Sequence, residues 1–292
     1  MSSQIIINII IAWSIYTLVA VSFALIYQTT LFFHFAHAVI FTSGAYFAFL
    51  FNQILGWSYY TAIPAAIFLS LFLGVLMEVF FYKPLRGKKA SAIILLLASL
   101  GIYIVLQNLI SMVFGDDTKS IRTWEVKEGL NVFGGYITPV QIIIVAGNFL
   151  LILAVAGYLS MVKTGKVMRA VSNSQELSKL SGIKSDKIIL ISFAVGSALA
   201  GIAGILVSLD VDMTPTMGLN MLLMGIVAMI IGGVGSIRGI VLGSLLLATA
   251  QNLTVWFISS QWMDAIAFGL LLIFLLFRPQ GFYGKKLKKA EV

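Results

Sequence analysis

The chain has 292 residues, of which 60% are apolar and 10% are charged, and it carries a formal net charge of +8. So little polar surface cannot cover a single water-soluble core, which excludes an ordinary soluble domain and indicates a protein of the lipid bilayer. The chain contains no cysteine, which excludes disulfides and thiolate metal sites. The basic excess does not indicate a nucleic-acid partner, because membrane topology explains how the basic residues are distributed.

The first expected span covers residues 5–27. No Lys, Arg, Asp or Glu precedes Glu78, so the start lacks the basic segment of a cleaved secretory signal. We therefore expect the first span to insert by itself, and the sequence leaves the side of the N-terminus open. Residues 31–51 can form a second span, although polar and small residues interrupt it over 34–44.

The middle of the chain contains three clear apolar runs, at 91–114, 139–162 and 188–209. Each reaches the ~20 residues that cross the hydrocarbon core as a helix, and no strand-length alternation favours a barrel. The sequence predicts an all-α polytopic membrane protein with about eight transmembrane helices, including broken or re-entrant half-helices. We expect residues 1–292 to form a single transmembrane domain.

Lys and Arg gather in three regions, which the positive-inside rule places in the cytoplasm. The clusters are Lys83, Arg86, Lys88 and Lys89; Lys163, Lys166, Arg169, Lys179, Lys184 and Lys187; and Arg278, Lys285, Lys286, Lys288 and Lys289. Residues 163–187 are thus expected to be a cytoplasmic loop and residues 279–292 a basic cytoplasmic tail. Residues 115–137 mix both signs of charge and are expected to be an external loop.

The last third of the chain allows two arrangements. Residues 221–258 are broken by GGVGSIRG at 232–239, so they form either two abbreviated spans or a re-entrant pair of half-helices. A broken helix in each half is typical of internally repeated transporter folds, in which irregular backbone lines a pathway. An ordinary glycine turn is the simpler alternative. The candidate pathway residues are His34, His37, Ser43, Asn220, Gly232, Gly233 and Gly235.

Small residues recur at helical spacing along two expected spans. In lipid, the close approach of helix backbones depends on such residues. We expect Gly201, Gly204, Gly239 and Gly243 to lie at tight helix contacts.

Sequence motifs for catalysis are missing. MVKTGKV at 161–167 contains Gly165 and Lys166 but lacks the first glycine and the final Ser or Thr of a phosphate-binding loop. His34 and His37 are one helical turn apart, yet no third histidine or thiolate exists, so we expect packed histidines rather than a metal site. Glu78 and Asp264, both near span ends, are weak candidates for proton coupling. We expect no catalytic residue, no metal and no cofactor in this chain.

The charged stretch 165–187 is predicted to contain a short helix. Ser172 with Gln175 and Asn173 with Glu176 have capping-box spacing, and Gly182 has the character of a residue that ends a helix. Ser185 and Asp186 are expected at the N-cap and first turn of the next span. Leu177 and Leu180 lie on one face of the short helix. This pattern favours a surface that docks into another protein over a solvated loop.

Four motifs in chain order resemble permease subunits of the branched-chain amino-acid ABC importer family, and their first motif and short N-terminus are more similar to its H-type subunit. They are HFAHAVIFTSGAY, TGKVMRAVSNSQELSKLSGIKSDKIILISFAVGSALAGIAGIL, GGVGSIRGIVLGSLLL and FRPQGFYG. His34 stands where the family usually has Asn, Ala38 where it has Gly, and Arg238 where it often has Pro. The solute therefore stays open between branched-chain or other amino acids, urea and short amides.

The resemblance implies a multi-pass subunit of the bacterial cytoplasmic membrane that moves a small solute inward. A second homologous permease, two cytoplasmic ATPases and an extracytoplasmic binding protein would be its partners, with ATP and Mg held by the ATPases. The residues expected to couple to the ATPases are Arg169, Glu176, Leu177, Leu180 and Gly182. The alternative is a stand-alone channel or a secondary transporter for a small solute.

Overall fold

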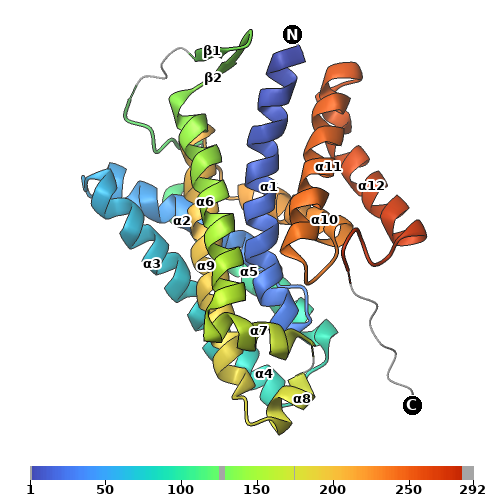
Figure 1. Ribbon diagram of the computed structural model, residues 1–292. Coiled ribbons are helices and arrows are strands. Elements are labelled where there is room, and N and C mark those ends of the chain that lie inside the picture. The colour runs from blue at the N-terminus through green and yellow to red at the C-terminus, as the bar shows by residue number, and fades with distance from the viewer. Residues whose placement is uncertain (1, 125–128, 174, 285–292) are drawn as a thin grey trace.

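Helices that run between two opposite ends dominate the architecture (Figure 1). The structure is a computed structural model that describes residues 2–124, 129–173 and 175–284, without the side chains of residues 2, 175, 176 and 179. Within these residues, seven helices are long and apolar enough to cross a membrane, and shorter apolar helices accompany them. The predicted all-α polytopic membrane fold is confirmed.

The elements follow one another in a simple order. They are α1 (Ser2–Thr30), α2 (His37–Phe49), a π-helical turn (Leu50–Ile54), α3 (Tyr59–Met77), a second π-helical turn (Glu78–Tyr82), α4 (Lys83–Gly87), α5 (Ala92–Phe114), β1 (Leu130–Val132), β2 (Gly135–Ile137), α6 (Pro139–Met161), α7 (Lys163–Asn173), α8 (Gln175–Leu180), α9 (Ser185–Asp210), α10 (Met217–Gly232), α11 (Ile237–Phe257), a 3-10 turn (Ser260–Trp262) and α12 (Met263–Phe277).

One end of the bundle, here the hairpin end, carries the antiparallel β1–β2 hairpin and the N-terminus (Figure 1). Gln4 exchanges hydrogen bonds with the backbone of Tyr136, at 3.1 and 2.8 Å. The segment before the hairpin also joins the α9–α10 connection, because Lys119 and Met213 form an antiparallel bridge. The start of α1 therefore lies on the same side as residues 115–124 and 129–137. The sequence had left the side of the N-terminus open.

The opposite end, here the basic end, is formed by α4, α7 and α8 (Figure 1). Two of the three basic clusters lie on or beside these helices, which the sequence places far apart along the chain. The basic residues of these two clusters, which the positive-inside rule assigns to the same side of the membrane, thus lie at one end of the molecule.

Helices α1 and α9 form the centre of the bundle. Two thirds of the apolar window is buried in each, compared with 6% in the span that contains α12. Polar side chains are costly in an apolar interior unless they form hydrogen bonds. The buried hydroxyls of Ser14, Thr17 and Ser22 in α1 therefore donate hydrogen bonds to backbone carbonyls of the same helix. The peripheral helices expose apolar side chains, as expected where lipid is the neighbour.

The interruption predicted over residues 34–44 is present only at the start of that range. The chain is non-helical at 31–36, where Leu31 has φ = 58°, and α2 runs from His37 through Ser43 and Gly44. Gly44 lies inside this helix, and the α9 backbone at Gly201 occupies the space that a side chain there would need. The polar and small residues therefore serve packing inside α2 rather than a break.

Residues 221–258 form two helices joined by a short turn. Helix α10 has 16 residues and is shorter than a full span, whereas α11 has 21 residues. Helix α2, with 13 residues, is also short, and the two short helices meet where Gly218 lies against Ala38 and Thr42. A short apolar helix from each half thus reaches the middle of the bundle.

Candidate functional site

The outermost part of the basic end is a surface formed by α7 and α8. We call it the α7–α8 surface and define it by Lys166, Arg169, Leu177 and Leu180. The leucines are 65% and 85% exposed, and the two basic side chains are exposed beside them. Glu176 lies within α8, but its side chain is outside the described residues. The surface combines positive charge with exposed apolar side chains.

Helix α7 was not predicted from the sequence. Its inner side buries Met168 and Val171, and a side chain at Gly165 would overlap the carbonyl oxygen of Tyr158 in α6. Amphipathic spacing of the buried residues was the available signal, but the surrounding charges made the stretch resemble a loop. Helix α7 therefore packs firmly under α6 and holds α8 outward.

The C-terminus of α8 has the predicted glycine. Gly182 has φ = 78°, and the N–H of Ile183 donates to the carbonyl of Ser178 at 3.0 Å, which is the Schellman pattern. The N-terminal caps proposed at 172–176 depend on Asn173 and on residues 174–176, which lie partly outside the described residues. The start of α9 agrees with the prediction in part. Asp186 lies in the first turn, but the N-cap is Lys184 without a side-chain cap, and the Ser185 hydroxyl is buried inside the first turn.

His34 and His37 are buried inside the chain, at 0% and 1% exposure. His34 Nδ1 lies 3.0 Å from the Tyr82 hydroxyl, and His37 Nε2 lies 2.9 Å from the Ser22 hydroxyl. The other ring nitrogen of each histidine has no hydrogen-bond partner in the described part of the chain. The two rings brace the start of α2 against α1 and the π-turn that ends α3.

Glu78 lies in the same π-helical turn as Tyr82, and it is buried and paired. Both of its carboxylate oxygens accept hydrogen bonds from the Arg86 guanidinium, one of them at 3.0 Å. A buried carboxylate is stable only with such compensation. We therefore interpret Glu78 and Arg86 as a structural ion pair at the basic end.

The predicted pathway glycines lie at the α10–α11 turn. Gly232 lies against the backbone of Gly239, and Gly233 has φ = 98° and lies against the segment that follows α12. Phe282 and Tyr283 donate backbone hydrogen bonds to Ile231 and Gly232 at 2.9 and 3.0 Å. Gly235 is exposed at the turn, whereas Asn220 is exposed near the opposite end of α10 and Ser43 is buried in α2. The structure therefore does not bring the seven candidate residues into one site.

The four packing glycines occupy close helix contacts. Gly201 faces Ser70, Gly204 faces the backbone of Phe41, and Gly239 and Gly243 face the backbone of Gly232. A β-carbon at any of them would overlap the neighbouring helix. The backbones of α9 with α2, and of α11 with α10, touch at these points.

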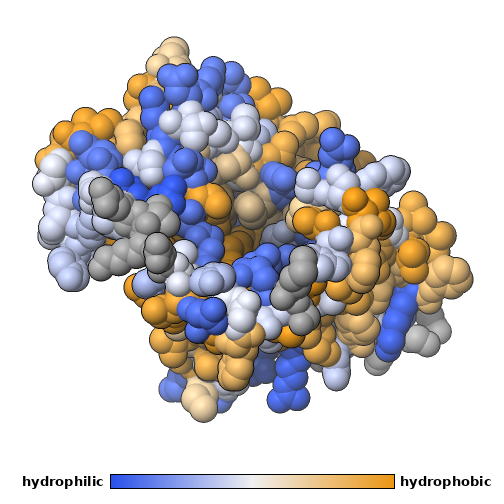
Figure 2. Space-filling view, turned by 90° about the horizontal axis from the view of Figure 1, so that it is seen from above, coloured by the Kyte–Doolittle hydropathy of each residue, from blue (hydrophilic) through white to orange (hydrophobic). Residues whose placement is uncertain are grey.

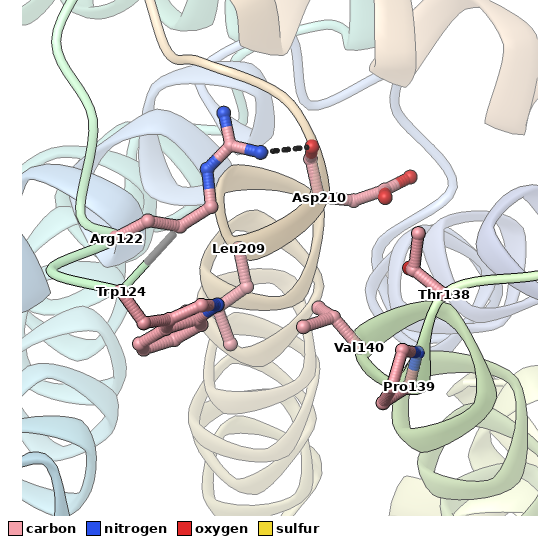
Figure 3. A pocket seen from close by; sticks show the side chains of 7 residues that line it. All are labelled: Arg122, Trp124, Thr138, Pro139, Val140, Leu209 and Asp210. Atoms are coloured by element: carbon pink, nitrogen blue, oxygen red, sulfur yellow. Dashed lines mark hydrogen bonds between the residues drawn. The ribbon is translucent and has the colours of Figure 1, made fainter. Parts of the chain in front are cut away.

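A pocket at the hairpin end was not predicted. It is lined by the segment before the hairpin, the first turn of α6 and the last turn of α9: Arg122, Trp124, Thr138, Pro139, Val140, Leu209 and Asp210 (Figure 3). The sequence marked this loop as external from its mixed charges but carried no spacing motif that joins residues so far apart. Figure 2, which looks onto this end, shows hydrophilic residues beside a hollow in the face.

Among the described residues no group of three His, Cys, Asp or Glu side chains lies close enough together to hold a metal ion. A structural comparison gives a weak likeness to PsaBC from Streptococcus pneumoniae in complex with Fab, with a TM-score of 0.49, 11% identity and coverage of 97% of this chain and 92% of that one. It carries no argument.

Sequence comparisons are decisive. Residues 5–276 match the family model described as branched-chain amino acid transport system / permease component. The high-affinity branched-chain amino acid transport system permease protein BraD of Pseudomonas aeruginosa is 31% identical, over 97% of this chain and 95% of BraD. LivH of Escherichia coli K12, a permease protein of the same kind of system, is 29% identical over 93% and 92% of the two chains.

The four sequence motifs, the nearly full-length matches and the apolar helices of the structure all indicate the same kind of membrane protein. A multi-pass location in the cytoplasmic membrane follows from the apolar helices and these relatives. The chain belongs to the permease family of the branched-chain amino acid transport system.

Proposed function

We propose that this chain is the membrane subunit of an ATP-driven importer and docks cytoplasmic ATPases on its α7–α8 surface. The observation that carries the proposal is the exposure of Leu177 and Leu180, at 65% and 85%, on a helix held outward by α7. Exposed apolar side chains at the rim of a membrane protein are unfavourable in water unless a partner covers them. Arg169 and Lys166 add positive charge that would steer an acidic partner surface.

The division of labour follows from the chain's own chemistry. Its sequence has no phosphate-binding loop, so ATP and Mg would be held by the ATPases, and this subunit would be non-catalytic. A second homologous permease would complete the pathway, and an extracytoplasmic binding protein would deliver the solute to the hairpin end. Under this proposal the hairpin end faces outward and the basic end faces the cytoplasm.

Movement of the ATPases would reach the spans through packed contacts. Gly165 lies against the backbone of α6, and α8 leads through Gly182 directly into α9, the central helix. Packed helices transmit displacement because their interiors cannot deform continuously. His34 and His37 would brace the start of α2 against α1 during this movement, rather than contact the solute.

The solute proposed is a small polar or amphipathic molecule. Relatives are named for branched-chain amino acid transport, and a partial relative, the xylose permease XylH of Haemophilus influenzae, is named for a sugar. XylH matches only 49% of this chain, so we place amino acids first among the solutes.

The test replaces both leucines of α8. Leu177→Asp with Leu180→Asp should abolish ATPase assembly and solute-stimulated ATP hydrolysis, because two buried charges would replace the apolar contact. The measurements are co-purification with the ATPases and hydrolysis by the reconstituted complex. Leu130→Asp is the matched control, because Leu130 is 54% exposed at the opposite end. Unchanged assembly and hydrolysis in the double variant would overturn the docking assignment.

A second measurement separates an importer from a channel or secondary transporter. Uptake by the complete complex should stop when ATP is depleted while the ion gradients are maintained. Uptake that persists without ATP would favour the alternative.

A further inference from the structure

The pocket at the hairpin end joins a carboxylate to an apolar wall (Figure 3). Trp124, Pro139, Val140 and Leu209 supply the wall, and Asp210 stands at its edge. The ring of Trp124 is held in place by Tyr59, with the ring centroids 5.3 Å apart. The apolar side of the pocket is therefore held in place.

The charges of the pocket do not cancel. Arg122 donates to the carboxylate of Asp212 at 2.7 Å and to the backbone carbonyl of Asp210 at 3.0 Å. Figure 3 shows the Asp210 carboxylate directed away from this guanidinium. Among the described residues Asp210 is in no ion pair within 4.0 Å. One negative charge therefore remains beside the apolar wall.

A side-chain amide lies beside that carboxylate, because Gln141 and Asp210 line the same second cleft. Gln141 Oε1 accepts from the Thr138 backbone N–H at 3.0 Å, as part of the capping box of α6. The remaining polar atom of Gln141 is its side-chain nitrogen, which can only donate. Asp210 also lines a second, more open cleft with Asn8, Tyr16 and Asn252, so its carboxylate lies between two hollows.

We infer that the Asp210 pocket is an extracytoplasmic subsite for an amino acid with an apolar side chain. The carboxylate binds the ammonium group of the solute, since a partly buried carboxylate without a cation favours a charge-assisted hydrogen bond. Trp124, Val140 and Leu209 cover the apolar side chain. The inference rests on the proposed function only for the choice of a transported amino acid over other amines.

The subsite can be tested by binding, without transport. The whole permease is placed in nanodiscs of phosphatidylcholine, a lipid without a primary amine, and L-leucine is titrated while tryptophan fluorescence is recorded. A saturable change is expected, and Trp124→Phe should remove it although four of the five tryptophans remain. 4-Methylpentanoate, which is leucine without its ammonium group, should give no saturable change.

The variant Asp210→Asn keeps the size of the side chain and removes its charge. It should weaken leucine binding at least tenfold, whereas Asp117→Asn, which changes an exposed carboxylate on the segment that carries Arg122 and Trp124, should leave binding unchanged. Equal leucine affinity in Asp210→Asn and the parent, or no saturable binding by the parent, would overturn the inference. A response to added phosphatidylethanolamine but not to leucine would assign the pocket to a lipid and would also overturn it.

These outcomes are independent of the proposed function. ATP-dependent uptake by the complex without leucine binding at this pocket would contradict the subsite and leave the importer intact. Leucine binding without ATP-dependent uptake would contradict the importer instead.

Discussion

Helices α8 and α9 are neighbours in the chain and opposites in their packing. Helix α9 places Gly201 against Ser70 and Gly204 against the backbone of Phe41, with no room for a side chain. Helix α8, in contrast, leaves Leu177 and Leu180 largely exposed. The fold explains every contact of α9 at these glycines. The fold does not account for the exposure of the two leucines of α8. A partner that covers them would account for it.

The largest effect is expected where α9 packs most closely. In Gly204→Val the new side chain would overlap the Phe41 carbonyl, and because backbone cannot move aside cheaply the variant should lose more than ~3 kcal/mol of stability. Folded protein recovered from the membrane, measured by size-exclusion chromatography, should fall sharply.

Gly101→Val is the matched control, because nothing lies within 4 Å of a β-carbon at Gly101. If both variants were recovered equally, the close α2–α9 contact would be wrong. Loss of folded protein in Gly204→Val alone would confirm that contacts within the chain determine how α9 packs.

A smaller effect is expected at the histidine brace. His37→Ala removes the ring bonded to Ser22 at 2.9 Å and should cost about 2 kcal/mol, while assembly with the ATPases persists. Uptake should fall, because the start of α2 would lose its brace against α1. The measurements are thermal unfolding and uptake, and unchanged uptake would remove His37 from the transport mechanism.

The smallest effect concerns the hairpin end and depends on pH. The hydrogen bonds from Arg122 and Ser120 hold the pKa of Asp212 below its ordinary value of 3.8. The group is exposed, so the pair should contribute less than ~1 kcal/mol. This contribution is present above the ordinary pKa and is lost as the pH falls through the lowered pKa.

Asp212→Asn should therefore lower the unfolding temperature slightly at pH 7, and the difference from the parent should shrink toward pH 3. A difference that widened on acidification would contradict the pairing. The small loss of stability expected in this exposed loop contrasts with the large loss expected at the glycine contacts of α9.

The sequence predicted the class of fold and the main spans because apolar length alone decides whether a helix can cross a bilayer. It also predicted the C-terminal glycine of α8, since the positive φ of Gly182 is a local property. The break predicted over 34–44 was too long, because hydropathy cannot distinguish residues that interrupt a helix from those, such as Gly44, that pack it against a neighbour.

Residues brought together by tertiary structure were beyond sequence patterns. Arg122 and Asp210 are joined by a hydrogen bond from a loop to the end of α9, and no spacing rule relates them. Helix α7 was hidden by its charges, although Met168 and Val171 repeat on one side. The family resemblance predicted more than the spacing patterns did, because its four motifs are spread along nearly the whole chain.

The most direct test of the central claim is crosslinking from α8. The chain has no cysteine, so Leu180→Cys introduces a single thiol, and a thiol-to-amine crosslinker can report which protein lies beside it. Docking predicts a crosslink from Leu180→Cys to an ATPase subunit and none from Leu130→Cys at the hairpin end. Equal crosslinking from both positions, or none from Leu180→Cys in an assembled complex, would contradict the assignment of the α7–α8 surface.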